Sequence, residues 1–585
     1  MADPTNTEIA ASLDELGDLY ELDGAVIHRI VAYRNGAKAA REASTSVAQL
    51  AREGRATSLP GIGATLQEKI VALTETGEIP ALEKLRAKFP PGLVEMTRLP
   101  GLGPKRARRL FEELGIDSLQ ALQTAAQEGR IADLKGFGEK AQTSLLEAVL
   151  AHQQSGPARR VVLDQALKVG EELLAAIREQ PTTARAELAG SARRMTESVK
   201  DLDIVATATD PAALARAAST LPQVEAASTP GENAVRLRTH SGLHVDLRIV
   251  EPDQFGNVLQ HLTGSKEHNV ALRDLAVRKG LHISEYGVLD DATGVTHRCA
   301  TEQEVYALIG MNYIEPELRE NRGELEAARV GAKPGLPELV TVADLKGDLH
   351  SHTTASDGTA STEEMAQAAR AAGYEYLVIT DHSASMGFGA DVSANELRRQ
   401  IDRVREIDQG MDGFTLLIGS EVNILPDGSL DYPDELLAEL DWVIASVHTS
   451  FRMGEEEMTN RIVAAIEHPY VDCIGHLTGR KIQRRPPYEL DFEAVVEAAV
   501  KSGTMLEINS NPDRRDLNEL HARGAAAAGA GIVINTDSHR VDGFAVARYG
   551  VATARRAWLT PSQILNTRPW TELAPLRKRA RPTRD

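Results

Sequence analysis

Cysteine is scarce in this chain, since its 585 residues include only Cys299 and Cys473. Two isolated cysteines exclude a disulfide framework and a zinc site built from several thiolates. The sequence also lacks an apolar run long enough to cross a bilayer, and its first residues lack the basic and then apolar pattern of a signal peptide. We therefore expect a cytoplasmic protein with no membrane-spanning segment.

Positive charge is outweighed by negative charge, and the net charge is −20. If the charge were spread evenly, this balance would argue against a nonspecific polyanion binder. Basic residues instead gather in two clusters, at residues 104–109 and 577–581. The length predicts about three to five domains. The pattern fits an enzyme that binds nucleic acid at chosen faces and uses carboxylates to hold metal ions.

Two aspartates lie in a short segment that alternates polar and apolar residues, from Asp201 to Ile204. In a strand, side chains at positions i and i+2 point the same way, so Asp201 and Asp203 project together. Asp246, in a second apolar strand, is the candidate third carboxylate. Because carboxylate oxygens suit Mg²⁺ or Mn²⁺, the three indicate a two-metal site for phosphoryl or nucleotidyl transfer. The alternative is a solvated strand edge.

A glycine and a serine, Gly190 and Ser191, come shortly before these aspartates. Glycine lets the backbone approach a phosphate, and the side chains of Ser191, Arg193 and Arg194 can then donate hydrogen bonds to it. This spacing favours the metal site over the solvated strand edge.

A Gly-x-Gly pattern occurs three times in the first 155 residues, which are otherwise typical of helices. Backbone N–H groups at the start of the following helix form a ready phosphate site. Such a contact goes to the DNA backbone and carries no sequence information. One copy alone would indicate only a tight turn. The residues predicted to contact DNA are Gly61, Gly63, Gly101, Gly103, Lys105, Gly136 and Gly138.

From residue 345 onward, apolar segments alternate with helical ones, which is typical of a parallel α/β barrel. Metal-ligand residues recur at or near the ends of the predicted strands, where barrel enzymes keep their active sites. Imidazole together with carboxylate suits Zn²⁺ or Mn²⁺. One such histidine would be an ordinary core residue, but nine ligands indicate a metal centre. They are His350, His352, Asp357, His382, Glu421, His448, His476, Asp537 and His539.

The segment 190–203 resembles the nucleotidyltransferase core of the bacterial and archaeal family X DNA polymerases, in the form that carries an appended phosphoesterase domain. The resemblance makes Asp246 the third metal ligand and implies that dNTPs are substrates. Met195 and Lys200 stand where family members usually have glycine.

The three Gly-x-Gly segments resemble the helix-hairpin-helix motifs that these polymerases carry. The resemblance places Lys69 at the Schiff-base position of a 5′-deoxyribose-phosphate lyase, with Tyr33 as a supporting residue. A lysine can be such a nucleophile when burial or neighbouring cations depress its pKa. The alternative is a surface lysine that touches DNA phosphate.

Residues 251–319 resemble the nucleotide-selection subdomain of the family. The resemblance implies that the turn Gly264-Ser265 holds the incoming sugar, that Asn269 contacts the base edge or minor groove, and that Arg273 contacts the template strand. His261-Leu262 stands where members often have a Tyr-Phe pair that helps to exclude the ribose 2′-hydroxyl, so sugar discrimination stays open.

The nine ligands resemble the PHP (polymerase and histidinol phosphatase) domain, which holds up to three Zn²⁺ or Mn²⁺ ions. The resemblance implies that Glu421 bridges two of the ions. The implied sites are His350, His352 and Asp537 for one ion, His448 and His476 for the second, and Asp357, His382 and His539 for the third. Arg480, Asn509, Asn511 and Arg515 are the candidate phosphate contacts.

We therefore expect a multidomain chain with a helical helix-hairpin-helix region, an α+β nucleotidyltransferase palm and a C-terminal PHP domain folded as a distorted TIM-like barrel. The expected parts are 1–80 (helical, lyase-like), 81–155 (fingers), 156–250 (palm), 251–319 (nucleotide selection), 320–343 (linker), 344–572 (PHP) and 573–585 (basic tail).

The expected function is gap filling in DNA repair by a monomer, with a 3′–5′ exonuclease or 3′-end phosphoesterase in the PHP domain. In one alternative, the palm is a DNA-binding platform with little synthesis and the PHP domain does the only chemistry. In a second alternative, the PHP domain is a small-molecule phosphatase fused to a DNA-binding arm.

Overall fold

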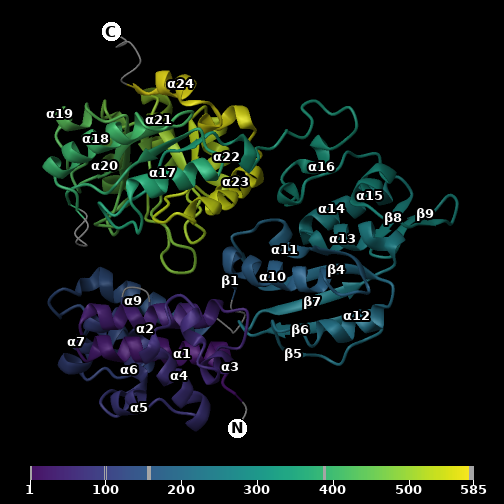
Figure 1. Cartoon of the computed structure of the whole chain (residues 1–585), viewed down its shortest axis with the longest axis horizontal. Coiled ribbons are helices and arrows are strands. Elements are labelled where there is room, and N and C mark those ends of the chain that lie inside the picture. The colour runs from purple at the N-terminus through teal and green to yellow at the C-terminus, as the bar shows by residue number, and fades with distance from the viewer. Residues whose placement is uncertain (1–2, 98, 100–101, 155–159, 386–390, 579–585) are drawn as a thin grey trace. The chain divides into compact units, whose positions relative to one another are not determined.

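The computed structural model (Figure 1) describes residues 3–97, 99, 102–154, 160–385 and 391–578. The chain divides into two compact units. One unit consists of Met1–Ala192, Ser198–Thr263 and Gly280–Val305. The other consists of Arg193–Glu197, Gly264–Lys279 and Tyr306–Asp585. No helix in the described part of the chain is both long and apolar enough to cross a membrane.

The N-terminal half of the first unit is helical, as its glycine-punctuated sequence predicts. Helix α1 begins with a capping box between Thr5 and Glu8, and α4 and α7 end at Gly77 and Gly115, both in the left-handed conformation that glycine adopts without strain. The apolar faces share one core of mostly Leu, Ile and Ala. The helices are α1 (Asn6–Leu22), α2 (Ile27–Glu42), α3 (Val47–Arg52), α4 (Ala64–Thr76), α5 (Pro80–Arg86), α6 (Pro91–Thr97), α7 (Pro104–Leu114), α8 (Leu119–Gln127) and α9 (Gly138–Gln154).

A five-stranded sheet, in the order β2-β4-β7-β6-β5, follows in the same unit. Leu202 and Ile204 of β4 are fully buried, whereas Asp201 and Asp203 on the alternate face are half-buried, so the predicted alternation is confirmed. The strands are β2 (Thr183–Leu188), β4 (Asp201–Ala208), β5 (Val224–Ala227), β6 (Ala234–Thr239) and β7 (His244–Ile249), and the helices are α10 (Leu163–Arg178), α12 (Pro211–Ala218) and α13 (Phe255–Thr263).

Further elements precede, interrupt or follow the strands of this sheet in the sequence. Strands β8 (Leu281–Ser284), β9 (Gly287–Asp290) and β10 (Thr296–His297) form a small antiparallel sheet. Two-residue strands β1 (Val161–Val162) and β3 (Ser198–Val199) pair with each other. The helices here are α11 (Gly190–Arg193), α14 (Lys266–Val277), α15 (Glu302–Leu308) and α16 (Glu324–Ala327).

Seven parallel strands, β11 to β17, form the sheet of the second unit in chain order. The backbone N–H of His352 donates to the carbonyl of Ser538 at 2.8 Å, and Ser351 and Ser538 form a parallel bridge. The last strand segment thus returns to the first, which confirms the predicted barrel. The strands are β11 (Gly347–Asp348), β12 (Tyr376–Ile379), β13 (Thr415–Asn423), β14 (Trp442–Ser446), β15 (Cys473–Ile474), β16 (Met505–Asn509) and β17 (Ile532–Asn535).

The barrel strands are apolar because their residues are buried on both faces, as parallel strands covered by helices require. Tyr376, Trp442 and Cys473 belong to one apolar cluster, and a larger cluster joins the strands to the helices. The helices between and after these strands are α17 (Thr362–Ala371), α18 (Ala394–Asp408), α19 (Asp434–Leu437), α20 (Glu455–Glu467), α21 (Phe492–Ser502), α22 (Glu519–Ala527), α23 (Ala547–Arg556) and α24 (Trp570–Leu573).

Candidate metal centre and polymerase site

The nine predicted ligands of the barrel converge at the carboxyl ends of its strands. His350 and His352 follow β11, Glu421 lies in β13, and the remaining ligands follow their strands or lie in the adjoining loops. The side chains of His350, His352 and Glu421 are at most 1% exposed. Charged groups this deeply buried require partners of opposite charge or a metal ion.

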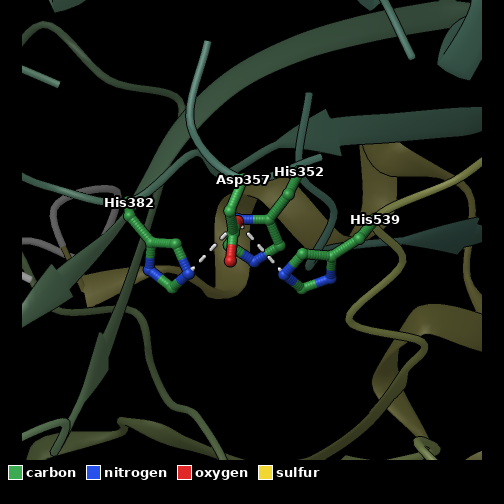
Figure 2. A group of neighbouring side chains, drawn as sticks. All are labelled: His352, Asp357, His382 and His539. Atoms are coloured by element: carbon green, nitrogen blue, oxygen red, sulfur yellow. Dashed lines mark ion pairs between the residues drawn. The ribbon is translucent and has the colours of Figure 1, made fainter. Parts of the chain in front are cut away.

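One ligand group surrounds the carboxylate of Asp357 (Figure 2). Its Oδ1 lies 3.2 Å from Nε2 of His539 and 3.5 Å from Nε2 of His382. The third imidazole is that of His352, whose Nδ1 is 3.8 Å from the same oxygen. The structure therefore brings together the three residues expected at the third ion and adds His352 to them.

A second group contains His350, His352 and Asp537, as expected for the first ion. Nε2 of His350 and Nε2 of His352 lie 3.5 Å and 3.2 Å from Oδ1 of Asp537. The same two nitrogens lie 3.4 Å and 3.5 Å from Oε2 of Glu421. Because its two ring nitrogens face different groups, His352 joins this group to the one around Asp357.

Glu421 organises the third group, which includes His382 and His448. Its Oε1 lies 2.9 Å from Nε2 of His476 and 3.2 Å from Nε2 of His448, and its Oε2 lies 2.9 Å from Nδ1 of His382. The two oxygens of Glu421 thus face different imidazoles, as a bridging carboxylate must.

The donor set fits divalent metal ions. The buried nitrogens Nε2 of His350, both ring nitrogens of His352 and Nδ1 of His476 have no hydrogen-bond partner in the described chain. Orphaned buried nitrogens of this kind are rare unless another ligand satisfies them. Imidazole and carboxylate at this density are the ligands of Zn²⁺ and Mn²⁺ sites.

The electrostatics of the cluster agree with its donor set. Burial opposes the charged form of Glu421, but the imidazoles of His448, His350 and His382 outweigh it and hold the pKa of the carboxyl well below its usual value. Burial and the neighbouring imidazoles of His539 and His382 lower the pKa of His352 to about 4. Burial opposes the charged form of His382, but Glu421 and Asp357 outweigh it and raise the pKa of this imidazole to about 10. Binding of a metal ion at His382 would therefore displace a proton.

A buried carboxylate that the sequence pattern did not reveal hydrogen-bonds two of the ligand residues. Glu507 of β16 is 0% exposed, and it accepts hydrogen bonds from Nδ1 of His350 at 2.7 Å and from the backbone N–H of His476 at 2.8 Å. A carboxylate in this position fixes the tautomer of a ligating histidine. The available signal was a glutamate in an otherwise apolar strand that ends at Asn509.

The four expected phosphate contacts have differing surroundings. Arg480 pairs with Glu197 at 2.5 Å, and Arg515, 1% exposed, donates to the carbonyl of Met195 at 3.0 Å and to Thr553 at 2.9 Å. The amide of Asn509 donates to Asp537 and Glu507, at 3.1 Å and 3.2 Å. The backbone N–H of Asn511 donates to Oδ1 of Asn509 at 3.0 Å. Arg480, Arg515 and Asn509 thus have protein partners in this structure.

The palm carboxylates meet across one strand pair. β4 and β7 run parallel, and Asp203 lies directly opposite Asp246 in their register. Gly190 approaches so closely that a Cβ at its position would lie 2.3 Å from Oδ2 of Asp203, and its φ is +65°. Arg236 pairs with Oδ1 of Asp246 at 3.0 Å. The sheet therefore brings together the expected third carboxylate and the glycine expected to approach phosphate.

The expected nucleotide-selection residues lie at the start of α14. Gly264 has a φ of +66°, and Ser265 caps the helix by accepting a hydrogen bond from the backbone N–H of His268 at 3.2 Å. Asn269 and Arg273 follow on α14. His268 is fully buried between Glu324, at 2.7 Å, and the hydroxyl of Tyr306, at 3.0 Å, which fixes this helix.

The Gly-x-Gly segments stand at helix starts, as predicted. Gly63 and Gly103 are the N-cap residues of α4 and α7, with no side chain capping the N–H groups, and Gly138 begins α9. Gly61 and Gly136 have φ angles of +98° and +89°. Lys105 lies in the first turn of α7 and is exposed. Gly101 lies outside the described residues.

Lys69 lies in α4 and is half-buried. Within the described part of the chain, its ammonium group makes no ion pair or side-chain hydrogen bond. Tyr33 is 3% exposed and stacks on Tyr20 with a ring separation of 5.2 Å. Burial, followed by the neighbouring Tyr20, raises the pKa of Tyr33 to about 12.

One known protein matches this chain over nearly its whole length. The chain is 35% identical over 574 residues to the "DNA polymerase/3′-5′ exonuclease PolX" of Bacillus subtilis, and the match covers 98% of this chain and 99% of that protein. This chain belongs to the family X DNA polymerases that carry a PHP domain. The family relationship confirms the resemblance found in the sequence.

Four family models match separate stretches of this PHP-containing polymerase between residues 4 and 511. A helix-hairpin-helix domain matches residues 4–79, a SAM-like helix-hairpin-helix tandem 93–148, the DNA polymerase beta thumb 258–320 and the PHP domain 348–511. The chain is also 36% identical over 201 residues to a probable phosphatase of Acetivibrio thermocellus, and the match covers 33% of this chain and 78% of that protein. A probable phosphatase of Thermoanaerobacter sp. is 33% identical over 233 residues, and the match covers 38% of this chain and 89% of that protein.

Two positions at which this family X polymerase has no glycine differ in their conformation. Met195 has a φ of +55°, the left-handed region that glycine occupies without cost. Its carbonyl accepts the hydrogen bond from Arg515 described above. Lys200, directly before β4, is exposed. The backbone at position 195 therefore has the conformation for which glycine is suited, although the side chain is methionine.

Proposed function

We propose that this protein is a DNA-directed DNA polymerase that fills short gaps during DNA repair, and that its barrel removes nucleotides from 3′ ends. The similarity to a polymerase and exonuclease over 98% of the chain carries this proposal. The nine-ligand centre of the barrel and the paired aspartates of the palm supply a separate candidate site for each activity.

In the palm, Asp201, Asp203 and Asp246 would hold Mg²⁺ or Mn²⁺. Parallel pairing of β4 with β7 supports this role because it places Asp203 beside Asp246. Gly190, Ser191 and Arg194 would bind the phosphates of the incoming dNTP. Gly264, Ser265 and Asn269 would contact the sugar and base of this dNTP, and Arg273 would contact the template strand.

In the barrel, the nine ligands would hold up to three Zn²⁺ or Mn²⁺ ions. Bound ions of this kind supply a water of lowered pKa and neutralise phosphoryl oxygens. Glu421 holds imidazoles from three strand ends in place, and Glu507 orients His350. The four predicted phosphate contacts remain part of the proposal: Arg480, Asn509, Asn511 and Arg515.

The helical N-terminal region would bind the DNA backbone at its three Gly-x-Gly segments. Uncapped N–H groups at Gly63 and Gly103 support this role. A Schiff-base role for Lys69 belongs to the same proposal and is tested by borohydride trapping on 5′-deoxyribose-phosphate DNA. We further propose the predicted division into seven parts, a monomeric protein and action in the cytoplasm.

The decisive experiment uses a 5′-labelled primer on a one-nucleotide-gapped duplex with Mn²⁺, with and without dNTPs. Three proteins are compared: the wild type, Asp201→Ala with Asp203→Ala, and His350→Ala with His352→Ala. We expect extension to disappear only in the aspartate variant and shortening only in the histidine variant, so each variant controls for the folding of the other site. A wild type that shortens the primer but never extends it would show that the palm is only a DNA-binding platform.

A small-molecule phosphatase is the second candidate for the barrel, because two probable phosphatases match 33% and 38% of the chain, and most of the length of each is covered. Hydrolysis of p-nitrophenyl phosphate, compared with shortening of a 3′-recessed duplex, separates the candidates. A phosphatase would act on the monoester and leave the duplex intact.

A further inference from the structure

An arginine that the sequence did not single out lies against the metal-ligand cluster. The guanidinium Nε of Arg514 is 3.8 Å from Oδ2 of Asp537, and the Arg514 side chain is only 14% exposed. The other oxygen of Asp537 is the one that faces His350 and His352. Arg514 is therefore separated from the ligand cluster by a single carboxylate.

The Arg514 guanidinium has no hydrogen-bond partner among residues 3–97, 99, 102–154, 160–385 and 391–578. Arginine carries five N–H donors and stays charged in proteins. Buried donors of this kind are normally satisfied. An almost buried guanidinium whose nearest carboxylate is at 3.8 Å thus retains its capacity to bind an anion.

The arginines closest to it in the fold differ in this respect. Arg515, the next residue, is committed to Thr553 and to the carbonyl of Met195. Arg480 forms a two-pronged ion pair with Glu197, at 2.5 Å and 3.2 Å. Each of these two guanidinium groups is held by hydrogen bonds to protein groups, although Nε of Arg480 and Nη2 of Arg515 have no partner among the described residues. Within the same residues, the Arg514 guanidinium has no such bond to hold it.

Further cations surround the same place. Lys481 lies 3.6 Å from Asp513, and Arg485 donates to the carbonyl of Gly479 at 2.8 Å. Burial lowers the pKa of Lys481; Asp513 opposes this shift, and the nearby positive charge of Arg514 adds to it. Lys481 and Arg485 thus neighbour Arg514, and the carboxylates of Asp513 and Asp537 lie among these cations.

We propose that Arg514 is a substrate-contacting residue of the barrel that binds the nonbridging oxygens of the scissile phosphodiester. The planar guanidinium matches two phosphate oxygens and can donate two parallel hydrogen bonds to them. The inference rests on the proposed exonuclease function of the barrel. It adds Arg514 to the phosphate contacts that the sequence suggested, among them its neighbour Arg515.

The test compares Arg514→Gln and Arg514→Lys with Arg484→Gln, a matched control whose guanidinium is 63% exposed and 3.9 Å from Asp513. Kinetics of 3′ shortening are measured on the full chain with Mn²⁺. A hydrogen bond to a charged group contributes roughly 1.5–3 kcal/mol, so we expect Arg514→Gln to lower kcat/KM by about 10- to 100-fold. Arg514→Lys should recover part of the loss, and Arg484→Gln should stay within about twofold of the wild type.

Two further measurements separate phosphate binding from support of Asp537. The number and affinity of bound Mn²⁺ ions should be the same in Arg514→Gln and the wild type. Binding of dAMP, measured calorimetrically with and without Mn²⁺, should weaken in Arg514→Gln. Unchanged shortening, or a loss of Mn²⁺ affinity that parallels the loss of activity, would overturn the proposal.

Failure of the proposed function gives a different result. In that case the wild type would not shorten DNA at all, while primer extension by the palm would continue. The dAMP measurement then decides the role of Arg514 alone. Weaker dAMP binding by Arg514→Gln would still support an anion contact, and equal binding by both proteins would exclude it.

Discussion

Removal of the Glu507 charge is the sharpest test of how the barrel holds its ligands. Glu507 accepts four hydrogen bonds: from His350 at 2.7 Å and Asn535 at 3.0 Å on one oxygen, and from the His476 backbone at 2.8 Å and Asn509 at 3.2 Å on the other. In Glu507→Gln, one of these oxygens becomes an amide group. Two of the four donors then face another donor.

The magnitude follows from the role of the His350 contact. Nδ1–H of His350 donates to Glu507, which leaves Nε2 free to face Glu421 and Asp537. Loss of such a partner typically lowers metal affinity or activity by about 10- to 100-fold, which corresponds to about 1.4–2.7 kcal/mol. We expect a loss of that size in Glu507→Gln.

The assay is a calorimetric titration of the metal-depleted full chain with Mn²⁺, together with kinetics of 3′ shortening and of primer extension. Glu497→Gln serves as the control, because Glu497 is an exposed glutamate on α21 of the same unit. Extension should be unchanged in both variants. If Glu507→Gln bound Mn²⁺ within about twofold of the wild type and shortened DNA normally, the inferred support of His350 would be refuted.

Three further predictions concern other parts of the chain. Gly190→Ala should abolish extension and spare shortening, because the added Cβ would lie 2.3 Å from Oδ2 of Asp203 at a φ of +65°. Primer-extension and shortening assays check this prediction, and retained extension would contradict it. Burial opposes ionisation of Glu519, but Arg556 outweighs it and holds the pKa of the carboxyl at about 2. This contribution to stability is present above pH 4.5 and is lost as the pH falls toward 2. Glu519→Gln should therefore cost about 3–5 kcal/mol at pH 7, and thermal unfolding should show the gap to the wild type narrowing below pH 4.5. EDTA should stop extension and shortening, and added Mn²⁺ should restore both; activity that survives chelation would exclude metal dependence.

Much of the barrel could be predicted because its sequence pattern is simple. Parallel strands that are buried on both faces give short apolar runs, and polar residues directly after such runs must lie at one edge of the barrel. His350, His448 and Asp537 were located in this way. The β4 strand was equally clear, since Asp201 and Asp203 alternate with fully buried residues.

The direction of individual polar side chains could not be predicted in the same way. Arg514 and Arg515 are adjacent in sequence, yet one guanidinium lies beside Asp537 and the other donates to Met195 and Thr553. Arg515 has a φ of +45°, and nothing in the residue types signals that turn. Glu507 was missed because a single charge in an apolar strand does not reveal whether it faces solvent or a buried histidine.

Closure of the barrel between Ser351 and Ser538 has a consequence for how the protein is made. His350 and His352 lie on one side of this junction, and Asp537 and His539 lie on the other, so two of the three ligand groups draw residues from both ends of the domain. During synthesis from the N-terminus, those groups stay incomplete until the final strand has left the ribosome and joined the first. Bound ions would then cross-link the two ends of the domain and limit the freedom of the unfolded chain, much as a disulfide does. A protein whose two cysteines are free and buried would thus gain a long-range cross-link through imidazole and carboxylate ligands instead of through a disulfide.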